Sequence, residues 1–230
     1  MKRITLLTGL LLIVGVVNAQ QTITTWLDYN ENPVREVNAA CKKIITLSGD
    51  TSTTIRMIWF QSRYESIEHY CNGFPAGKWL HSINGKVLEE YDFTRVSYLS
   101  PSQIKERKVT DTAGIIPASF KGGEAAQLQF LKKHTRYPQI ALKNRYQGRS
   151  YISFIVKPDG KLTSFGVIKG CNPYLDYEAC RVLKSMPKWK PATSNGKPIA
   201  YPVIIPVKFT LDDEEESVID VETGGWGVWL

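Results

Sequence analysis

The chain has 230 residues, with 29 Lys and Arg against 22 Asp and Glu, which gives a formal net charge of +7 at pH 7. An apolar fraction of 43% and six tryptophans indicate packed cores and exclude an intrinsically disordered protein. Seven of the acids and none of the bases follow Leu211, so residues 1–211 carry +14 and residues 212–230 carry −7. The basic body suits acidic partners such as peptide segments, anionic lipid or cell-wall polymer, and it equally fits a lysine-rich soluble surface. Residues 212–230 predict a solvated acidic tail, with docking of its apolar end (Trp226, Val228, Trp229 and Leu230) left open.

The N-terminal segment has the pattern of a cleavable export signal. Two basic residues precede an apolar run over residues 4–17, and Val17-Asn18-Ala19 places small residues where a signal peptidase cleaves. A retained membrane anchor is the alternative, but a spanning helix needs about 20 apolar residues, and this run is shorter. We therefore expect residues 1–19 to be removed and the mature, periplasmic protein to begin at Gln20. The alternative location is the inner membrane, anchored by an uncleaved N-terminus.

Residues 20–98 are predicted to form an antiparallel β-meander. Runs rich in β-branched and aromatic residues are separated by turn signals, among them Asn72-Gly73 and Asn84-Gly85. The segment 77–93, in which Gly77-Lys78-Trp79 leads through Asn84-Gly85 into the next strand, weakly resembles a MORN-like hairpin. The predicted strands are residues 22–27, 43–47, 54–61, 64–70, 78–81 and 86–93.

The rest of the chain predicts an α+β domain. Residues 99–116 are polar, show little periodicity and are predicted to be a linker. Residues 117–211 then give the order helix, strand, strand, helix, strand, which predicts a three-stranded antiparallel sheet with two helices on one face. The helices are predicted at residues 124–133, stopped by Pro138, and at 175–186; the strands are predicted at 150–156, 162–168 and 199–211.

The four cysteines, Cys41, Cys71, Cys171 and Cys180, form neither a CxxC motif nor a Cys/His cluster with zinc-finger spacing. A metal site is therefore not predicted. In an oxidising compartment an even number of cysteines predicts disulfides. The preferred pairs are Cys41–Cys71 and Cys171–Cys180, because each would stay within one predicted domain. Free buried thiols are the alternative.

A series of short motifs runs through residues 117–211. In chain order they are Phe120-Lys121-Gly122-Gly123-Glu124, Tyr137-Pro138, Gly148-Arg149, Phe154-x-Val156, Pro158-Asp159-Gly160, Leu175-Asp176-x-Glu178-Ala179-x-Arg181, Met186-Pro187-Lys188-Trp189-Lys190-Pro191, Asn195-Gly196-Lys197-Pro198 and Ile205-Pro206-Val207-x-Phe209. Together they resemble the TonB C-terminal domain, in the form common in Bacteroidetes. The resemblance implies a periplasmic domain, associated with TonB-dependent transport, that binds the TonB box, a short extended peptide of outer-membrane TonB-dependent receptors.

The resemblance also implies where that peptide binds. In the family the first strand is central, so the last strand, residues 199–211, is expected at an edge where a peptide can add as a further strand. One of the two amides of Val203 and Val207 is expected to face the peptide and the other the central strand. The expected peptide-binding residues are Tyr137, Pro138, Ile199, Ala200, Tyr201, Val203, Ile205, Val207 and Phe209.

Other residues of these motifs are expected to have structural roles. Tyr137-Pro138 fits a helix stop with the tyrosine packed over the sheet as well as it fits a peptide contact. Trp189 is expected to anchor the core after the second helix. Gly122 and Gly123 are expected to shape the entry to the first helix, and Gly160 the turn between two strands.

The sequence predicts a binding module and not an enzyme. His69, His81 and His134 lie outside any motif, and the chain has no G-x-S-x-G, P-loop or H-E-x-x-H pattern. We expect no cofactor, and export argues against a nucleic-acid partner. A transducing TonB has an uncleaved anchor and a Pro-rich spacer. Here the N-terminal segment has the pattern of a cleavable signal and a β-module replaces the spacer, and without an anchor the protein cannot pull on a receptor by itself. The alternative function is an envelope interaction protein that binds peptidoglycan or another periplasmic protein; a homodimer is left open.

Overall fold

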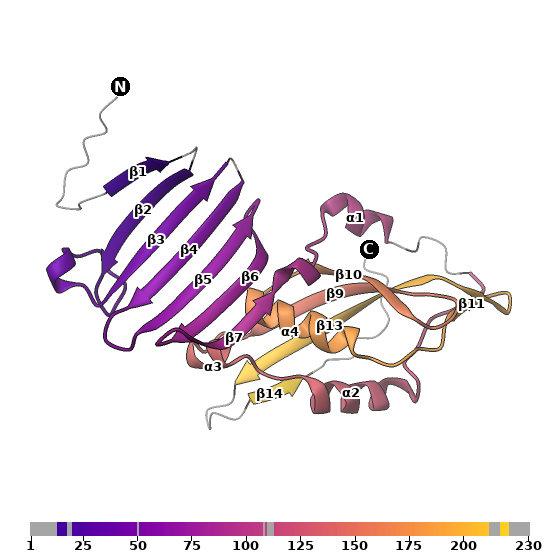
Figure 1. Cartoon of the computed structure of the whole chain (residues 1–230). Coiled ribbons are helices and arrows are strands. Elements are labelled where there is room, and N and C mark those ends of the chain that lie inside the picture. Colours follow the sequence, from indigo (N-terminus) through magenta and orange to yellow (C-terminus); the bar gives the residue numbers. More distant parts are fainter. Residues whose placement is uncertain are drawn as a thin grey trace. The chain divides into compact units, whose positions relative to one another are not determined.

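The chain divides into two compact units, Met1–Arg95 and Val96–Leu230 (Figure 1). The structure, a computed structural model, describes residues 13–17, 20–49, 51–107, 109, 113–211 and 217–220. The predicted signal peptide therefore lies outside the described residues except for Ile13–Val17, and the predicted acidic tail lies outside them except for Ser217–Asp220.

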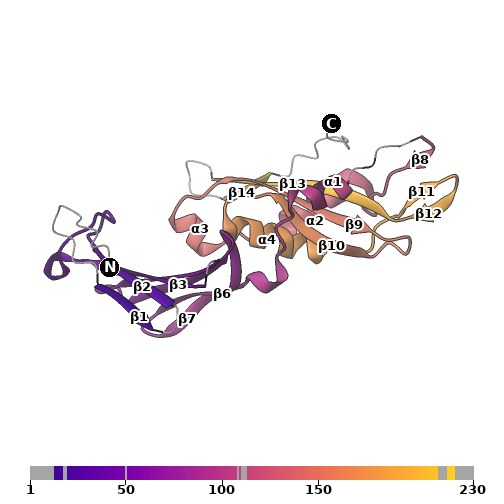
Figure 2. The same ribbon diagram turned by 90° about the horizontal axis from the view of Figure 1, so that it is seen from above.

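The first unit is the antiparallel meander that the sequence predicted, and its described strands pair in chain order from β1 to β7. Figure 2 shows the sheet nearly edge-on, as one curved layer. Both Asn-Gly pairs have positive φ at both residues, 52° and 77° at Asn72-Gly73 and 53° and 75° at Asn84-Gly85, as a two-residue hairpin turn requires. The elements are β1 (Ile13–Val17), β2 (Gln20–Leu27), η1 (Glu36–Asn38), β3 (Cys41–Ser48), β4 (Ser52–Trp59), β5 (Tyr64–Cys71), β6 (Phe74–Ile83), β7 (Lys86–Asp92) and η2 (Phe93–Arg95).

Trp79, the tryptophan of the MORN-like segment, is the centre of this unit's aromatic core. Its side chain is almost fully buried, and its ring centroid lies 5.0 Å from that of Tyr70 and 4.6 Å from that of Phe93. The indole Nε1 donates a hydrogen bond of 2.8 Å to the carbonyl of His69. One side chain thus joins β5, β6 and η2, which gives a single-layer sheet the packed core that an isolated hairpin lacks.

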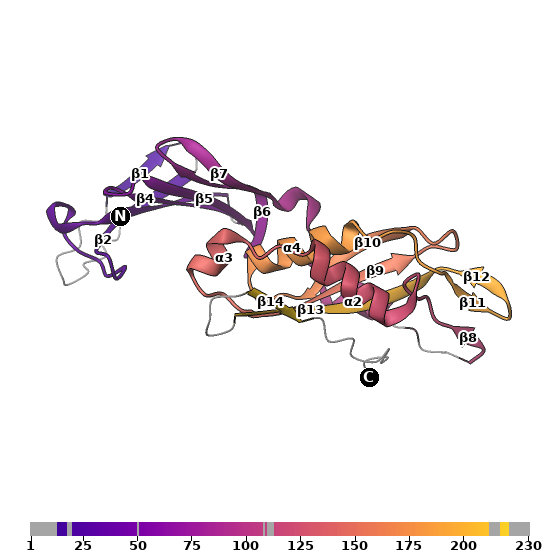
Figure 3. The ribbon, with the colours of Figure 1, turned by 90° about the horizontal axis from the view of Figure 1, so that it is seen from below.

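The second unit contains a main antiparallel sheet with the strand order β10-β9-β13-β14 and a small sheet with the order β12-β11-β8. As expected, the first long strand, β9, is central. The helices α2 and α4 lie across one face of the main sheet, with α3 beside α4 (Figure 3). The elements are α1 (Pro101–Glu106), β8 (Ile115–Ile116), α2 (Gly123–His134), α3 (Gln139–Lys143), β9 (Gly148–Val156), β10 (Leu162–Lys169), α4 (Pro173–Lys184), β11 (Ala192–Ser194), β12 (Lys197–Ile199), β13 (Tyr201–Leu211) and β14 (Ser217–Asp220).

The segment predicted as a linker, residues 99–116, lies inside the second unit. The backbone on both sides of Tyr98 is hydrogen-bonded to Val167 of β10. The N–H of Leu99 donates to the carbonyl of Val167, and the N–H of Val167 donates to the carbonyl of Ser97. Helix α1 follows, opened by a capping box between Ser100 and Gln103. Six residues of helix are too few to show periodicity in the sequence, which is why α1 was not predicted.

The predicted final strand, residues 199–211, is divided between two sheets. Ile199 is the last residue of β12, which pairs with β11. Ala200 belongs to neither strand, and β13 begins at Tyr201 and pairs with β9 as far as Phe209. The short hairpin β11–β12 follows from the Asn195-Gly196 turn, at which both residues have positive φ.

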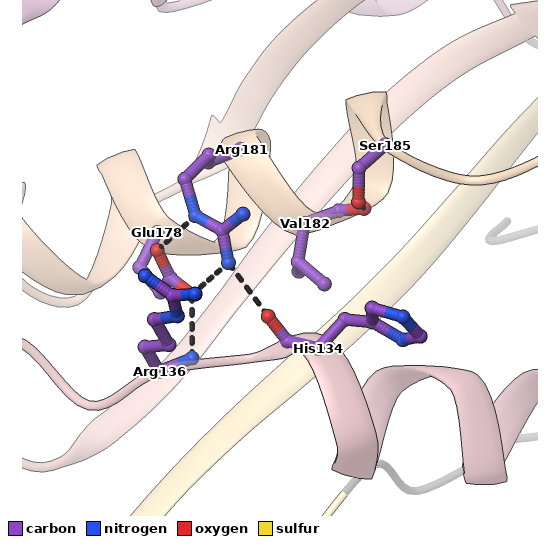
Figure 4. A network of polar contacts seen from close by, with 6 residues as sticks. All are labelled: His134, Arg136, Glu178, Arg181, Val182 and Ser185. Atoms are coloured by element: carbon purple, nitrogen blue, oxygen red, sulfur yellow. Dashed lines mark hydrogen bonds and ion pairs between the residues drawn. The ribbon is translucent and has the colours of Figure 1, made fainter.

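Two buried carboxylates on α4 hold the loops around the main sheet. Glu178 accepts hydrogen bonds from the backbone N–H of Arg136 at 2.6 Å and from the Arg181 guanidinium at 2.6 and 2.7 Å. The same guanidinium donates to the carbonyl of His134 at 2.6 Å (Figure 4). Because a buried charge is costly unless it is paired and hydrogen-bonded, this network fixes the chain between α2 and α3 against α4.

The second carboxylate, Asp176, accepts hydrogen bonds from three separate segments. Ser150 Oγ of β9 donates at 2.6 Å, the N–H of Cys171 at 3.1 Å and the hydroxyl of Tyr98 at 3.1 Å. Burial raises the pKa of Asp176 above its ordinary value, and the hydrogen bonds from Ser150 and Cys171 act in the opposite direction. Neither Asp176 nor Glu178 was predicted to have these roles, although both belong to the Leu175–Arg181 motif.

The structure contradicts the predicted disulfides, because all four cysteines are free. Cys41 pairs with Trp59 of β4 and Cys71 pairs with Ser52 of the same strand. Seven residues of strand separate these positions by about 23 Å, whereas a disulfide needs its Cα atoms within about 7 Å. In the second predicted pair, the helical rise from Pro173 to Cys180 is about 10 Å. This rise separates Cys180 from Cys171, which precedes the helix, by more than a disulfide spans.

We expect four free thiols with different reactivity toward Ellman's reagent. Cys71 is exposed and should react first. Cys171 is also exposed as a residue, but desolvation raises the pKa of its thiol, and it should react more slowly because the thiolate is the reactive form. Cys41 and Cys180 are buried, with the pKa of Cys180 raised to about 12, and should react only after unfolding. Fewer than four thiols in the unfolded, non-reduced protein would contradict this account.

Gly160 lies where the β9–β10 turn meets the chain after α4. Its φ is +79°, and a Cβ there would lie 2.3 Å from the carbonyl oxygen of Trp189. The N–H of Trp189 donates to the carbonyl of Gly160 at 3.0 Å. The indole of Trp189 is buried, with its ring 5.3 Å from that of Phe154. The turn and the tryptophan are thus fixed to each other, in agreement with the structural roles expected for both.

Gly160→Ala should destabilise the protein by about 2–4 kcal/mol, because a clash with rigid backbone adds to the strain of a positive φ. Gly196→Ala is the matched control, since Gly196 has φ +78° and open space around the added methyl group. The control should cost about 1 kcal/mol. Urea unfolding of the two variants measures the difference, and equal losses would contradict the close approach.

Candidate functional site

The outer edge of β13 is the candidate site. On its inner side β13 pairs with β9 from Tyr201 to Phe209. On its outer side it pairs with β14 from Lys208 to Leu211. Within the part of the chain that the structure describes, no strand pairs with the outer side of residues 201–207. An edge of this kind presents backbone groups that can bind another strand.

Two prolines show which residues of β13 face outward. In an antiparallel ladder, alternate residues direct both their N–H and C=O to the same neighbouring strand. Pro202 and Pro206 have no N–H, and both lie inside the continuous ladder with β9, so they belong to the set that faces away from β9. Leu211, an odd-numbered residue, confirms this phase because its N–H donates at 2.9 Å to Oε1 of Gln147, which immediately precedes β9.

The outward set is therefore residues 202, 204, 206, 208 and 210. Over residues 202–207, the N–H of Ile204 is the one backbone donor on this side, and it is flanked by the carbonyls of Pro202 and Pro206. Lys208 and Thr210 are the next two outward donors, and both lie where β14 pairs. An added strand thus meets one free donor and several free acceptors in this stretch.

Four of the residues predicted to bind the peptide have buried side chains instead. Val203, Ile205, Val207 and Phe209 are all in the core, beneath the helices, and their amides belong to the set that pairs with β9. The expectation that Val203 and Val207 differ in pairing is wrong, because residues four apart in a strand face the same side. Tyr201 begins β13 opposite Val156, and Ile199 and Ala200 lie before the strand.

Tyr137 and Pro138 are also buried, at 7% exposure for the tyrosine. The ring of Tyr137 packs edge-on against Phe209 at 5.6 Å, and its hydroxyl donates to the carbonyl of Tyr146. Burial raises the pKa of this phenol to about 12. These contacts fit the alternative in which Tyr137 packs over the sheet, and Tyr137 supports β13 from the helix side.

Ile204 and Lys208, which were not among the predicted peptide contacts, lie on the opposite face of the sheet, together with Pro202 and Pro206, the two prolines expected to limit pairing at the edge. Side chains on a strand alternate between faces, so Pro202, Ile204, Pro206 and Lys208 share the face away from the helices. Ile204 is 38% exposed there. Arg149 stands opposite Lys208 in the β9 register, which places two bases side by side. The spacing of Pro202 and Pro206 was a usable signal, since prolines four apart in a strand must both face an edge.

The segment before the sheet covers part of this face. A Cβ on Gly166 would lie 2.4 Å from Leu99, and Nη1 of Arg107 donates to Ser153 Oγ at 3.1 Å. Gly166 pairs with Ser153, so residues 96–107 cover the β10 side and the β9 centre. The β13 side carries the exposed Ile204.

The chemistry of the site rests on backbone groups. Among the residues with described positions, no group of His, Cys, Asp and Glu side chains has the arrangement of a metal site. Over the same residues, no helix has the length and apolar character needed to cross a bilayer. The arrangement can extend a sheet by one strand.

Comparison with known proteins supports the resemblance. A family model described as Gram-negative bacterial TonB protein C-terminal matches residues 133–211. The match begins at the last turn of α2 and ends with β13, so it is shorter than the predicted domain of residues 117–211 and excludes β14. Comparison with curated proteins and with solved structures finds no significant match. Residues 133–211 are therefore similar to the C-terminal domain of Gram-negative TonB proteins, the family that the motifs in this part of the chain resemble.

Proposed function

We propose that this protein is a periplasmic, non-enzymatic binding protein that captures an extended segment, the TonB box, of outer-membrane receptors. The observation that carries the proposal is the outer edge of β13 over residues 201–207, at which residues 202, 204 and 206 direct their backbone groups away from β9. Strand addition needs such an edge and gains its affinity from main-chain hydrogen bonds. The family assignment supports outer-membrane receptors as the class of partner.

The edge limits how strongly a peptide binds. One N–H, that of Ile204, and the neighbouring carbonyls are available over residues 202–207, so few main-chain bonds can form. A flexible peptide also loses conformational entropy when it becomes ordered. We therefore expect a dissociation constant on the order of micromolar. The exposed side chain of Ile204 and the paired bases Arg149 and Lys208 favour a peptide with apolar and acidic residues on that face.

Ile204→Pro should weaken binding of a synthetic TonB-box peptide about fivefold, because it removes one hydrogen bond worth about 1 kcal/mol. The protein should stay folded, since this N–H faces away from β9. Isothermal titration calorimetry with peptides copied from receptors of the same genome measures the dissociation constant, and circular dichroism checks the fold.

Two controls accompany this variant. Ile204→Ala shortens the exposed side chain and keeps the N–H, so it should weaken binding less than Ile204→Pro does. Ile205→Pro removes an inward N–H and should unfold the domain. Equal binding by the proline and alanine variants at residue 204 would show that the peptide does not pair with this edge.

We also propose that export precedes this function and that a signal peptidase cleaves after Ala19. Intact-mass spectrometry of the protein from its native host should give a chain that begins at Gln20. Cleavage would remove β1, which pairs with β2 from Val17↔Gln20 to Ile13↔Thr24, and would leave β2 at the edge of the meander. A chain in the membrane fraction that retains Met1 would contradict cleavage and favour an anchored, energy-transducing form.

A further inference from the structure

Part of the acidic tail folds back onto the candidate site. Ser217–Asp220 forms β14 and pairs antiparallel with β13, from Leu211↔Ser217 to Lys208↔Asp220 (Figure 1). The same strand also comes close to α2. The sequence predicted a solvated extension over residues 212–230, and for Ser217–Asp220 this expectation is wrong.

Strand β14 occupies the part of the edge that has most of its outward N–H donors. The outward residues of β13 that have an N–H are Ile204, Lys208 and Thr210, and β14 pairs with the last two. A partner strand that pairs along the whole edge would bond to all three N–H groups. A partner strand that leaves β14 in place would bond only to the N–H of Ile204. Because main-chain bonds provide the affinity of an added strand, the tail and a partner compete for the same groups.

Charge adds to this competition. Two bases, Arg149 and Lys208, stand opposite each other in the β9–β13 register, so an acidic strand suits this part of the edge better than a basic one. The register of β14 places Asp220 opposite Lys208, and the tail as a whole carries −7. The segment that matches the family ends at Leu211, so this acidic strand lies beyond it.

We propose that Ser217–Asp220 is a built-in competitor for the receptor peptide, and that a peptide gains full pairing along β13 only by displacing it. This proposal rests on the proposed function of the β13 edge. When the tail occupies the edge, the apparent affinity for the peptide equals the affinity of the open edge multiplied by the fraction of molecules in which the tail is undocked. If about nine molecules in ten have the tail docked, the apparent dissociation constant is about tenfold higher than that of the open edge.

Two proline variants of the full chain separate pairing from other effects of the tail. Lys208 and Thr210 face β14, so Val218, the partner of Thr210, contributes its N–H to this ladder, and Ile219, the partner of Phe209, does not. Val218→Pro should release the tail and strengthen binding of a synthetic TonB-box peptide about tenfold. Ile219→Pro is the matched control with the same residue added to the same strand, and it should change binding much less. Calorimetric titration gives both constants.

A second readout needs no receptor peptide. In the unbound Val218→Pro protein, the amides of Lys208 and Thr210 should exchange with solvent faster than in the Ile219→Pro protein, as followed by NMR. Equal peptide affinity and equal exchange in the two variants would overturn the proposal.

Failure of the proposed function gives a different result. If no receptor peptide binds even the Val218→Pro protein, the proposed function fails and competition for such peptides fails with it. Pairing of the tail with the edge is then judged separately, with a synthetic copy of residues 212–222 added to the Val218→Pro chain. Shifts of the Lys208 and Thr210 amides would establish that pairing, and their absence would reject it.

Discussion

A strand inside a sheet must direct N–H groups to both neighbours at alternate residues, and Pro202 and Pro206 have none to direct. Because the ladder between β13 and β9 is continuous, these prolines can only face outward, and this fixes the phase of every other residue in β13. The odd-numbered residues pair inward and bury their side chains beneath the helices. The even-numbered residues direct their backbone groups to the edge, where one donor remains between the two prolines, and their side chains to the sheet face away from the helices.

The edge can serve as a template only if β13 is held firmly from the other face. Tyr137 packs against Phe209, and the backbone next to it is fixed by Glu178 and Arg181. Asp176 joins β9, the start of α4 and the segment that carries Tyr98. These buried carboxylates are satisfied by converging donors, which is the condition under which buried charge is compatible with stability. We therefore interpret the Leu175–Arg181 motif as a scaffold for the edge and not as a contact for a partner.

Local signals predicted much of this fold, and non-local ones did not. The Asn-Gly hairpins of the meander and the order of the long elements after Gly123 depend on a few neighbouring residues each, and the structure has them. The predicted contacts on β13 had the wrong phase because apolar side chains were read as contacts, whereas Val203, Val207 and Phe209 form the core. The predicted disulfides joined cysteines of the same predicted domain, but the strand register places Cys41 and Cys71 beside opposite ends of β4. The charge of the tail concealed a four-residue strand whose partner lies in β13.

Amide hydrogen exchange of Ile204, followed by NMR with and without a receptor peptide, tests the central claim most directly. The unbound chain should show a protected amide at Val203 and at Ile205, which pair with β9, and a fast-exchanging amide at Ile204 between them. A bound peptide should slow the exchange of Ile204 and leave its two neighbours unchanged. A peptide that binds and protects amides elsewhere, while Ile204 keeps its fast exchange, would contradict the account.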